Sequence, residues 1–301
     1  MAFLQRINIF TLLREAFIEL KKNDPLRLAG ATAFFTTFAL PAVLIILIQV
    51  FGLILNPRYM SRQLFKNLAE TVGQNTAGEL HKTLFNVRHL FRNWYEAILG
   101  FLFLIFVATT LLKVIKDSLN QLWNIKVERP ASLAQGLLNR AKSFMVILFA
   151  GVLFMVVLLT ESGMHILYHP PNQQFWGDGP AVFTIIRQLI SLILVIIWFT
   201  LLFKFLPDGR PGWRTLMAGG IFTGFLFTIG KLVLQFLLSY NNMQTIYGAS
   251  TSSVLLLLFV FYSSFIFYFG ACFTKVWAEH HDTPIPPNAN AVKFEWAKVE
   301  W

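Results

Sequence analysis

Residues 30–55 read GATAFFTTFALPAVLIILIQVFGLIL and contain no charged side chain. As an α-helix this stretch would extend ~39 Å, which exceeds the ~30 Å hydrocarbon core of a bilayer. Pro41 lies inside the run, and membrane helices tolerate an internal proline better than soluble helices do. The stretch therefore predicts a membrane-spanning helix. Since Pro41 frees the carbonyl of Thr37 one turn earlier, we also expect a kink in the middle of this helix.

The composition of the whole chain agrees with a membrane protein. Hydrophobic residues make up 56%, charged residues 13%, and the mean hydropathy is +0.60. The net charge is +10, which in a membrane protein is typical of cytoplasmic loops rather than of nucleic-acid binding. Cys272 is the one cysteine, so an intrachain disulfide and a cysteine-based zinc site are excluded.

Five further apolar runs follow the first, at residues 97–112, 144–159, 181–203, 215–238 and 252–274. We therefore expect an all-α integral membrane protein, a bundle of six transmembrane helices spanning residues 30–279. Residues 1–29 are expected to form a cytoplasmic segment with an amphipathic helix at residues 7–20, whose Phe10, Leu13, Phe17 and Leu20 share one face. Residues 280–301 are rich in Pro and Asn and are expected to be a disordered cytoplasmic tail.

The distribution of Lys and Arg predicts the orientation. Basic residues concentrate in the segments that are cytoplasmic if both termini lie inside, including a set between the second and third spans: Lys113, Lys116, Lys126, Arg129, Arg140 and Lys142. We expect a multi-pass membrane protein with both termini cytoplasmic. The exception is the basic outer segment at residues 56–96, which is long enough for two amphipathic helices on the outer surface or capping the bundle.

Charged residues inside predicted spans are the strongest functional signal, because a charge is costly in lipid. Arg187 and Lys231 are each expected about 10 Å from the outer ends of their helices, by a rise of ~1.5 Å per residue. Glu161 ends the preceding span near the same level. One hypothesis is that Arg187, Lys231 and Glu161 bind an anionic group such as a lipid phosphate. The alternatives are a Glu161–Lys231 ion pair, or the extension of both cations to the outer interface.

Enzyme motifs are weak or missing in the sequence. HExxH, P-loop and GxSxG patterns do not occur. His165 and His169 lie one helical turn apart after Glu161, but Pro170 interrupts a helix there, and spacing alone is a poor criterion for a metal site. We expect no enzyme activity, catalytic residue, cofactor or metal. The GxxxG of Gly220 and Gly224 is expected to pack helices, within one chain or between the chains of a homo-oligomer.

Short motifs follow one another in a fixed order along the chain. Residues 31–41 begin AxAFF and end at Pro41, residues 119–123 contain LNxxW, and residues 205–214 contain FLP and WR. GK occurs at 230–231, YG at 247–248 and GA at 270–271. The residues of these motifs that we single out are Pro41, Asn120, Trp123, Pro207, Tyr247, Gly248 and Gly270.

In these motifs the chain resembles the YihY/BrkB family of bacterial inner-membrane proteins, over roughly residues 20–279. The resemblance implies six helices with both termini inside. Some members were long labelled ribonuclease BN, although the sequence shows no acid–base pair or metal cage for phosphodiester cleavage. This chain has Phe259 where the family usually has Trp, and Cys272 where it often has Glu, which argues against proton coupling at that position.

The sequence leaves three function classes open. The leading hypothesis is a membrane transporter, or a protein of the cell envelope that binds a lipid or another amphipathic anion. Its partners would be membrane lipids, anionic ones in particular, and no nucleic acid. The second is a structural or scaffold membrane protein without transport. A ribonuclease is the third and the least favoured.

Overall fold

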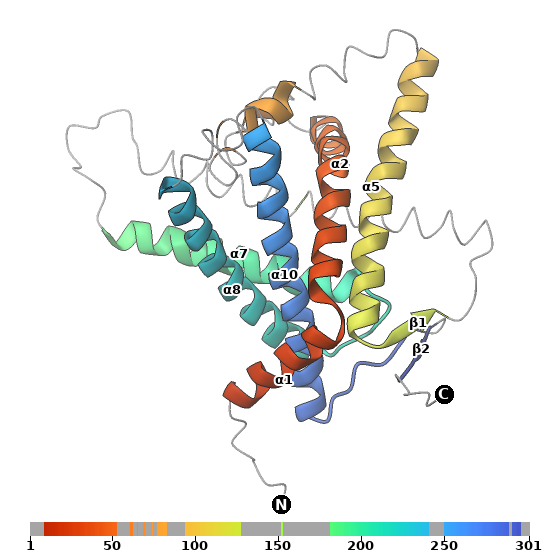
Figure 1. The fold of residues 1–301 in the computed structure, drawn as a ribbon, viewed down its shortest axis with the longest axis vertical. Coiled ribbons are helices and arrows are strands. Elements are labelled where there is room, and N and C mark those ends of the chain that lie inside the picture. The colour runs from red at the N-terminus through yellow and green to blue at the C-terminus, as the bar shows by residue number, and fades with distance from the viewer. Residues whose placement is uncertain are drawn as a thin grey trace, which may run out of the picture.

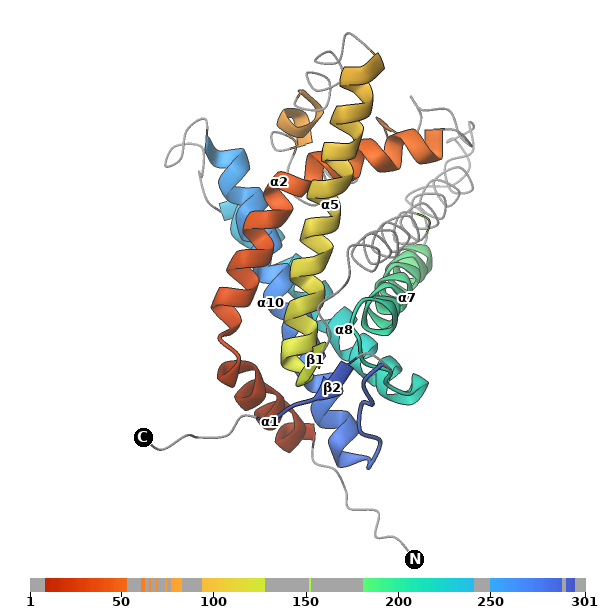
Figure 2. The same cartoon turned by 90° about the vertical axis from the view of Figure 1, so that its right-hand side faces the viewer.

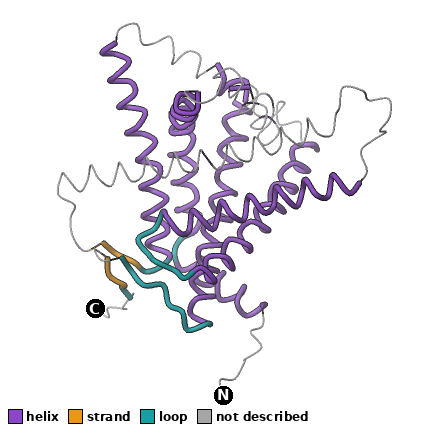
Figure 3. The backbone as a smooth tube through the Cα atoms, turned by 180° about the vertical axis from the view of Figure 1, so that it is seen from behind, coloured by secondary structure: helices purple, strands orange, loops and turns teal. Residues whose placement is uncertain are grey.

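A computed structural model describes residues 9–52, 94–127, 181–240, 250–288 and 291–295, together with 61–62, 65, 69, 74, 77–82 and 152. The helices are α1 (Ile9–Lys22), α2 (Pro25–Gly52), α5 (Trp94–Leu122), α7 (Ala181–Phe205), α8 (Trp213–Tyr240) and α10 (Thr251–His280). Two short strands, β1 (Ile125–Val127) and β2 (Ala291–Lys293), pair antiparallel. Figure 3 shows the strands at the base of the bundle, the end at which Figure 1 places α1.

Five of the described helices are long and apolar enough to cross a membrane. The candidate spans are Pro25–Ile45, Ile98–Leu122, Gln188–Phe205, Trp213–Leu234 and Thr251–His280. They correspond to five of the six predicted spans, and the all-α membrane fold is confirmed. The remaining predicted span, residues 144–159, lies outside the described residues except for position 152.

The helix α10 lies at the centre of the described bundle (Figure 1). It packs against α2 on one side and α8 on the other, while α5 packs against α2 and α7 against α8. The short helix α1 crosses the end of α10 at the base of the bundle. At the opposite end of α10, Leu256 packs with Leu80, so the short segment at 77–82 caps the bundle as expected for residues 56–96.

Figure 2 shows α2 changing direction about midway, so that its second half runs across the bundle. Pro41 lies in the middle of this helix. A proline removes one backbone hydrogen bond and its ring displaces the preceding turn, which bends the helix there. The predicted kink is therefore present.

Close packing of α8 against α10 depends on two glycines and two threonines, which we call the Gly–Thr contact. A Cβ atom at Gly219 would overlap Oγ1 of Thr274, and one at Gly270 would overlap Oγ1 of Thr223. Thr223 donates its hydroxyl to the carbonyl of Gly219 (2.6 Å), and Thr274 donates to the carbonyl of Gly270 (2.7 Å). Each helix thus contributes a Gly-x-x-x-Thr pair, and the two pairs fit together in antiparallel register.

The GxxxG motif of α8 faces the other neighbour, α7. A Cβ at Gly220 would overlap Thr200, and one at Gly224 would lie 2.7 Å from Cγ1 of Ile196. Small residues allow two helix backbones to approach closely where bulky side chains would hold them apart. The motif therefore packs helices within the chain, one of the two uses expected for it.

The C-terminal segment differs from the expected disordered tail. Ala291–Lys293 form β2, with Val127 opposite Ala291 and Ile125 opposite Lys293. The amide of Arg210 donates to the carbonyl of Pro286 (2.8 Å), and buried Ile285 packs into the core beside Trp123. The backbone hydrogen bonds and this apolar anchor fix the segment, whereas its Pro- and Asn-rich composition alone predicts disorder. The described α10 also ends at His280, one residue beyond the predicted domain boundary.

The face of α1 that packs against the bundle is offset from the predicted apolar face and shares only Leu20 with it among the fully buried residues. Leu12, Ala16 and Leu20 are fully buried, whereas Phe10 is 73% exposed and Phe17 53% exposed. Small Ala16 lets α1 approach α10 closely, and Phe17 lies at the edge of the contact, with its ring 6.2 Å from that of Phe269.

We predict that Gly219→Ala lowers stability by about 1–3 kcal/mol, because the added methyl overpacks the Gly–Thr contact. Gly30→Ala is the matched control, since a Cβ at this helical glycine meets nothing within 4 Å. Thermal unfolding of the purified protein in detergent measures both variants. Combining Gly219→Ala with Thr274→Ala should recover part of the loss. Equal melting temperatures for the two glycine variants would contradict the contact.

Candidate functional site

Lys231 is a half-buried cation within the candidate span of α8. It follows Gly224 by seven residues, which is about two helical turns. Lys231 therefore lies on the same stripe of α8 as Gly224, the stripe that contacts α7. A cation at this depth and in this position makes Lys231 the strongest candidate of the predicted site residues.

The register of α8 and α10 brings two hydroxyl groups to the level of Lys231. Because Gly219 lies opposite Thr274 and Thr223 opposite Gly270, the same antiparallel register places position 230 at the level of Ser263 and position 231 at the level of Tyr262. The contact at Gly230 agrees, since a Cβ there would lie 3.1 Å from Cε2 of Tyr262. Lys231, Tyr262 and Ser263 thus form one polar layer, which we call the Lys231 layer.

The hydroxyl groups of Tyr262 and Ser263 are buried and interact with each other, and neither makes a hydrogen bond of good geometry to a further described residue. They are adjacent on α10, and Phe259 packs edge-on against the Tyr262 ring. A buried polar atom without a partner costs about 1–3 kcal/mol, so a hydroxyl in this state calls for an explanation. The two hydroxyls lie at the level of an intramembrane lysine, and each can donate a hydrogen bond to an anion bound there.

Arg187 lies on α7 at a comparable level. Thr200 faces Gly220 and Ile196 faces Gly224, so α7 and α8 run antiparallel in a defined register. Arg187 lies ~13 Å along α7 from Ile196, and Lys231 lies ~10 Å along α8 from Gly224, toward the same end. This agrees with the predicted level of the two residues, although the side chain of Arg187 is outside the description.

Several predicted residues fall outside the described part of the chain. Glu161, His165 and His169 are among them, as are Tyr247 and Gly248 of the family motif. Among the described residues, no group of three or more His, Cys, Asp or Glu side chains is arranged to hold a metal ion.

The other motif residues meet at the base of the bundle. Asn120 and Asp208 exchange two hydrogen bonds of 2.8 Å, from the Asn120 amide to the Asp208 carboxylate and from the Asp208 amide to the Asn120 side chain. Lys116 binds the same carboxylate at 2.9 Å. The indole of Trp123 donates to the carbonyl of Ala271 (3.0 Å). Pro207 is buried in the same loop, so these motif residues join α5, the α7–α8 loop and α10.

Two ion pairs attach α1 to α10. Glu19 binds Lys275, whose side chain is only 8% exposed, and the His280 ring lies 2.6 Å from Glu15. Burial acts to raise the pKa of Glu19, but the hydrogen bond and the positive charge of Lys275, aided by Lys22, outweigh it and lower the pKa below its ordinary 4.5. The Glu19 carboxylate is therefore ionised at neutral pH and helps hold α1 in place.

Sequence reasoning missed several of these residues. Tyr262 and Ser263 are uncharged, so only the register between helices reveals them. Asp208 could have been identified from the sequence, because it directly follows the FLP motif at 205–207. Glu19 and Lys275 lie 256 positions apart, and no local pattern pairs them.

Comparison with known proteins supports the family resemblance. The model of a family described as "Virulence factor BrkB" matches residues 16–294. A "UPF0761 membrane protein" of Pseudomonas aeruginosa is 27% identical over 81% of this chain and 57% of its own length. Another from Teredinibacter turnerae is 24% identical over 89% of this chain and 60% of its own. The chain thus spans less than two thirds of the length of these relatives. No solved structure matches it.

We predict that stability conferred by Glu19 depends on pH. Because the pKa of Glu19 is lower in the folded state, its contribution is fully present above about pH 4.5 and is lost as the pH falls through the folded-state pKa. Glu19→Gln should therefore lower the melting temperature most at neutral pH, with the difference from the unmodified protein shrinking in acid. Glu279→Gln, an exposed acid on α10, is the control. A difference that is constant with pH would contradict the assignment.

Proposed function

Because the chain belongs to the family described as "Virulence factor BrkB", whose relatives are membrane proteins, we propose that it binds an anionic amphiphile in the membrane and moves it across the bilayer. The expected ligand class is a lipid with a phosphate headgroup. We place the binding group at the Lys231 layer, with Arg187 contributing from α7. We further propose the bacterial inner membrane as its location, with both termini in the cytoplasm.

The observation that carries the proposal is the composition of the Lys231 layer. A half-buried ammonium lies at the level of two buried hydroxyls, which interact with each other but have no further hydrogen-bond partner among the described residues. An ammonium and hydroxyl groups are donors, and a phosphate oxygen accepts strong charge-assisted hydrogen bonds from both. An anion at this level would satisfy all three groups, whereas an apolar ligand would satisfy none.

The surface next to Lys231 suits the apolar part of such a ligand. Leu232, Val233 and Phe236 follow Lys231 on α8, and all three side chains are exposed. In a membrane this surface faces hydrocarbon, so acyl chains lie against it at no cost. An amphiphile can then place its headgroup in the polar layer while its tails stay in the bilayer. Glu161 belongs to the proposal as a residue near the same level, and it lies outside the described part of the chain.

The scaffold alternative differs in what it predicts for Lys231. In a scaffold, the flexible lysine side chain only extends toward the interface, and no ligand is bound. No observation on the described residues favours a ribonuclease, and we propose binding and transport rather than catalysis.

We predict that Arg187→Gln with Lys231→Gln reduces the binding of phosphatidylglycerol to the purified protein by roughly tenfold or more, because each removes one cation from a weakly solvated site. Native mass spectrometry of the protein titrated with phosphatidylglycerol or phosphatidylcholine measures the effect. The matched control is Lys204→Gln with Arg214→Gln, which removes one cation from each of the same two helices at their other ends.

Tyr262→Phe with Ser263→Ala tests the hydroxyl donors without changing the charge. These substitutions should weaken phosphatidylglycerol binding by roughly a hundredfold and leave phosphatidylcholine binding unchanged, since each lost hydrogen bond to a charged group contributes about 1.5–3 kcal/mol. If the control pair at 204 and 214 weakens binding as much as the pair at 187 and 231, the Lys231 layer is not the site.

Transport is tested separately in reconstituted vesicles. Fluorescent phosphatidylglycerol should cross between leaflets faster with the protein than in vesicles without it, and the variant at 187 and 231 should lose this activity. A dithionite quenching assay reports the fraction of labelled lipid in the inner leaflet. Binding without any acceleration would contradict transport while leaving the binding site in place.

A further inference from the structure

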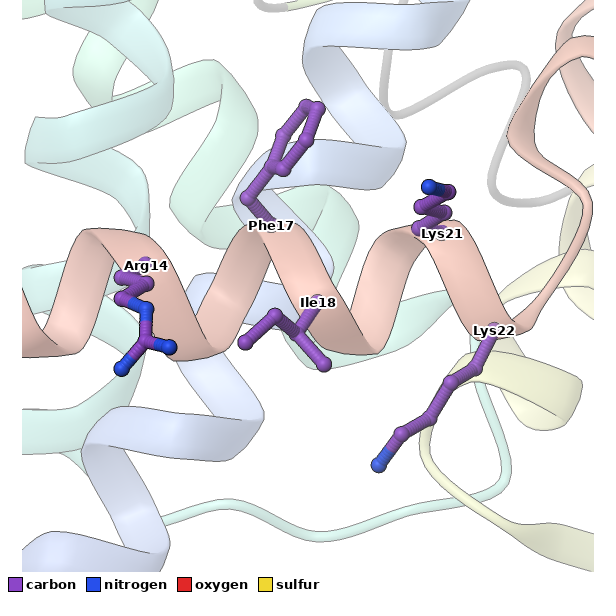
Figure 4. Close-up of a pocket in the computed structure, with 5 residues that line it drawn as sticks. All are labelled: Arg14, Phe17, Ile18, Lys21 and Lys22. Atoms are coloured by element: carbon purple, nitrogen blue, oxygen red, sulfur yellow. The ribbon is translucent and has the colours of Figure 1, made fainter.

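The outer face of α1 carries a second candidate site, remote from the Lys231 layer. A shallow cavity of about 500 Å³ lies along this helix, lined by Arg14, Phe17, Ile18, Lys21 and Lys22. Figure 4 shows Ile18 between the others, with Phe17 and Lys21 toward one edge and Arg14 and Lys22 toward the opposite edge. The lining therefore combines three cations with two apolar side chains.

The charges of α1 are separated between its two sides. Glu15 and Glu19 turn toward α10, where the His280 ring lies 2.6 Å from Glu15 and Lys275 forms an ion pair with Glu19. Lys22 lies 3.4 Å from Glu19 and is partly neutralised as well. Arg14 and Lys21 form no ion pair with a carboxylate in the described part of the chain. The exposed face is thus positive although the helix as a whole contains two acids.

The location of α1 places this face at a membrane surface. The helix ends at Lys22, and the span of α2 begins at Pro25, so α1 lies at the end of a membrane-crossing helix. Phe10, Phe17 and Ile18 are exposed on the same side as the cations. Cations beside exposed apolar groups are typical of a helix that lies in the interface, with its apolar residues among the acyl chains.

From these observations we propose that α1 is a binding site for the headgroup of an anionic phospholipid. Arg14 and Lys21 bind the phosphate, Lys22 adds a weaker contact, and Phe17 and Ile18 contact the first carbons of the acyl chains. The apolar lining is the reason for assigning a lipid rather than free phosphate. The ion pairs to α10 hold α1 so that its cationic face stays turned outward. This site does not depend on the function proposed for the Lys231 layer.

A fluorescent label beside the cavity tests the proposal locally. Thr11 is exposed on α1, and Cys272 is buried, so Thr11→Cys gives a single accessible position for a bimane label. The full-length protein is reconstituted in phosphatidylcholine vesicles that contain a minor share of phosphatidylglycerol. Bromine quenches bimane on contact. In one sample the acyl chains of phosphatidylglycerol are brominated, and in the other those of an equal amount of phosphatidylcholine are brominated.

The preference for phosphatidylglycerol is the bimane quenching by brominated phosphatidylglycerol divided by the quenching that its share of the bilayer predicts. We expect a preference of several-fold, because each cation near an anionic headgroup raises the local concentration of the anionic lipid by a factor of about five. Arg14→Gln with Lys21→Gln should bring this preference close to one. The matched control, Lys113→Gln with Lys126→Gln, removes two other exposed cations and should keep the preference. The melting temperature in phosphatidylcholine alone verifies that each variant is folded.

Four results would overturn the proposal. The labelled protein could show no preference for phosphatidylglycerol, or the control pair could abolish the preference as completely as the α1 pair. A third such result is that soluble glycerol phosphate, added at constant ionic strength, removes the preference. That result would show that the site binds free phosphate rather than a lipid. Loss of the preference in the variant at 187 and 231, with α1 unchanged, would show that the label reports the other site.

Discussion

The close approach of α8 to α10 is the contact on which the rest of the described structure depends. Gly219 and Gly270 provide the space, and Thr274 and Thr223 fill it from the opposite helix. Each threonine hydroxyl bonds to a carbonyl of its own helix, so the contact leaves no polar group without a partner. Since lipid is as apolar as the helices, shape and hydrogen bonding rather than the hydrophobic effect determine how such helices pack.

This contact determines what lies beside Lys231. With α10 fixed against α8 on one side and α7 fixed against Gly220 and Gly224 on the other, positions 231 and 262 come to one level, and position 187 lies close to it. Displacing α10 by one turn would move Tyr262 about 5 Å away from Lys231. The Lys231 layer is thus a consequence of helix packing. Its members can be identified only when the register between the helices is known.

Much of the fold follows from the sequence, because a long apolar run in a chain of this composition has few alternatives to a membrane helix. The span around Pro41 and its bend were predicted. The family motifs at Asn120 and Trp123 indicated where the chain is similar to known proteins, and the structure shows that they join three elements at the base.

Other features depend on contacts between distant segments and could not be predicted. The strand at Ala291–Lys293 requires β1 as its partner, and Pro- and Asn-rich composition alone indicated disorder. The burial of Leu12, Ala16 and Leu20 depends on the shape of α10, whereas helical periodicity favoured the face with Phe10 and Phe17. Tyr262 and Ser263 carry no charge and belong to no motif, so their relation to Lys231 appears only in three dimensions.

Photo-crosslinking tests the central claim, that the Lys231 layer holds an anionic headgroup, most directly. Phosphatidylglycerol with a photoreactive group in its headgroup is bound to the protein, irradiated, and the modified peptides are identified by mass spectrometry. The account predicts adducts in α8 around Lys231 and in α10 around Tyr262, displaced by unlabelled phosphatidylglycerol and not by phosphatidylcholine. Adducts confined to α1 and to the helix ends at the membrane surface would contradict it.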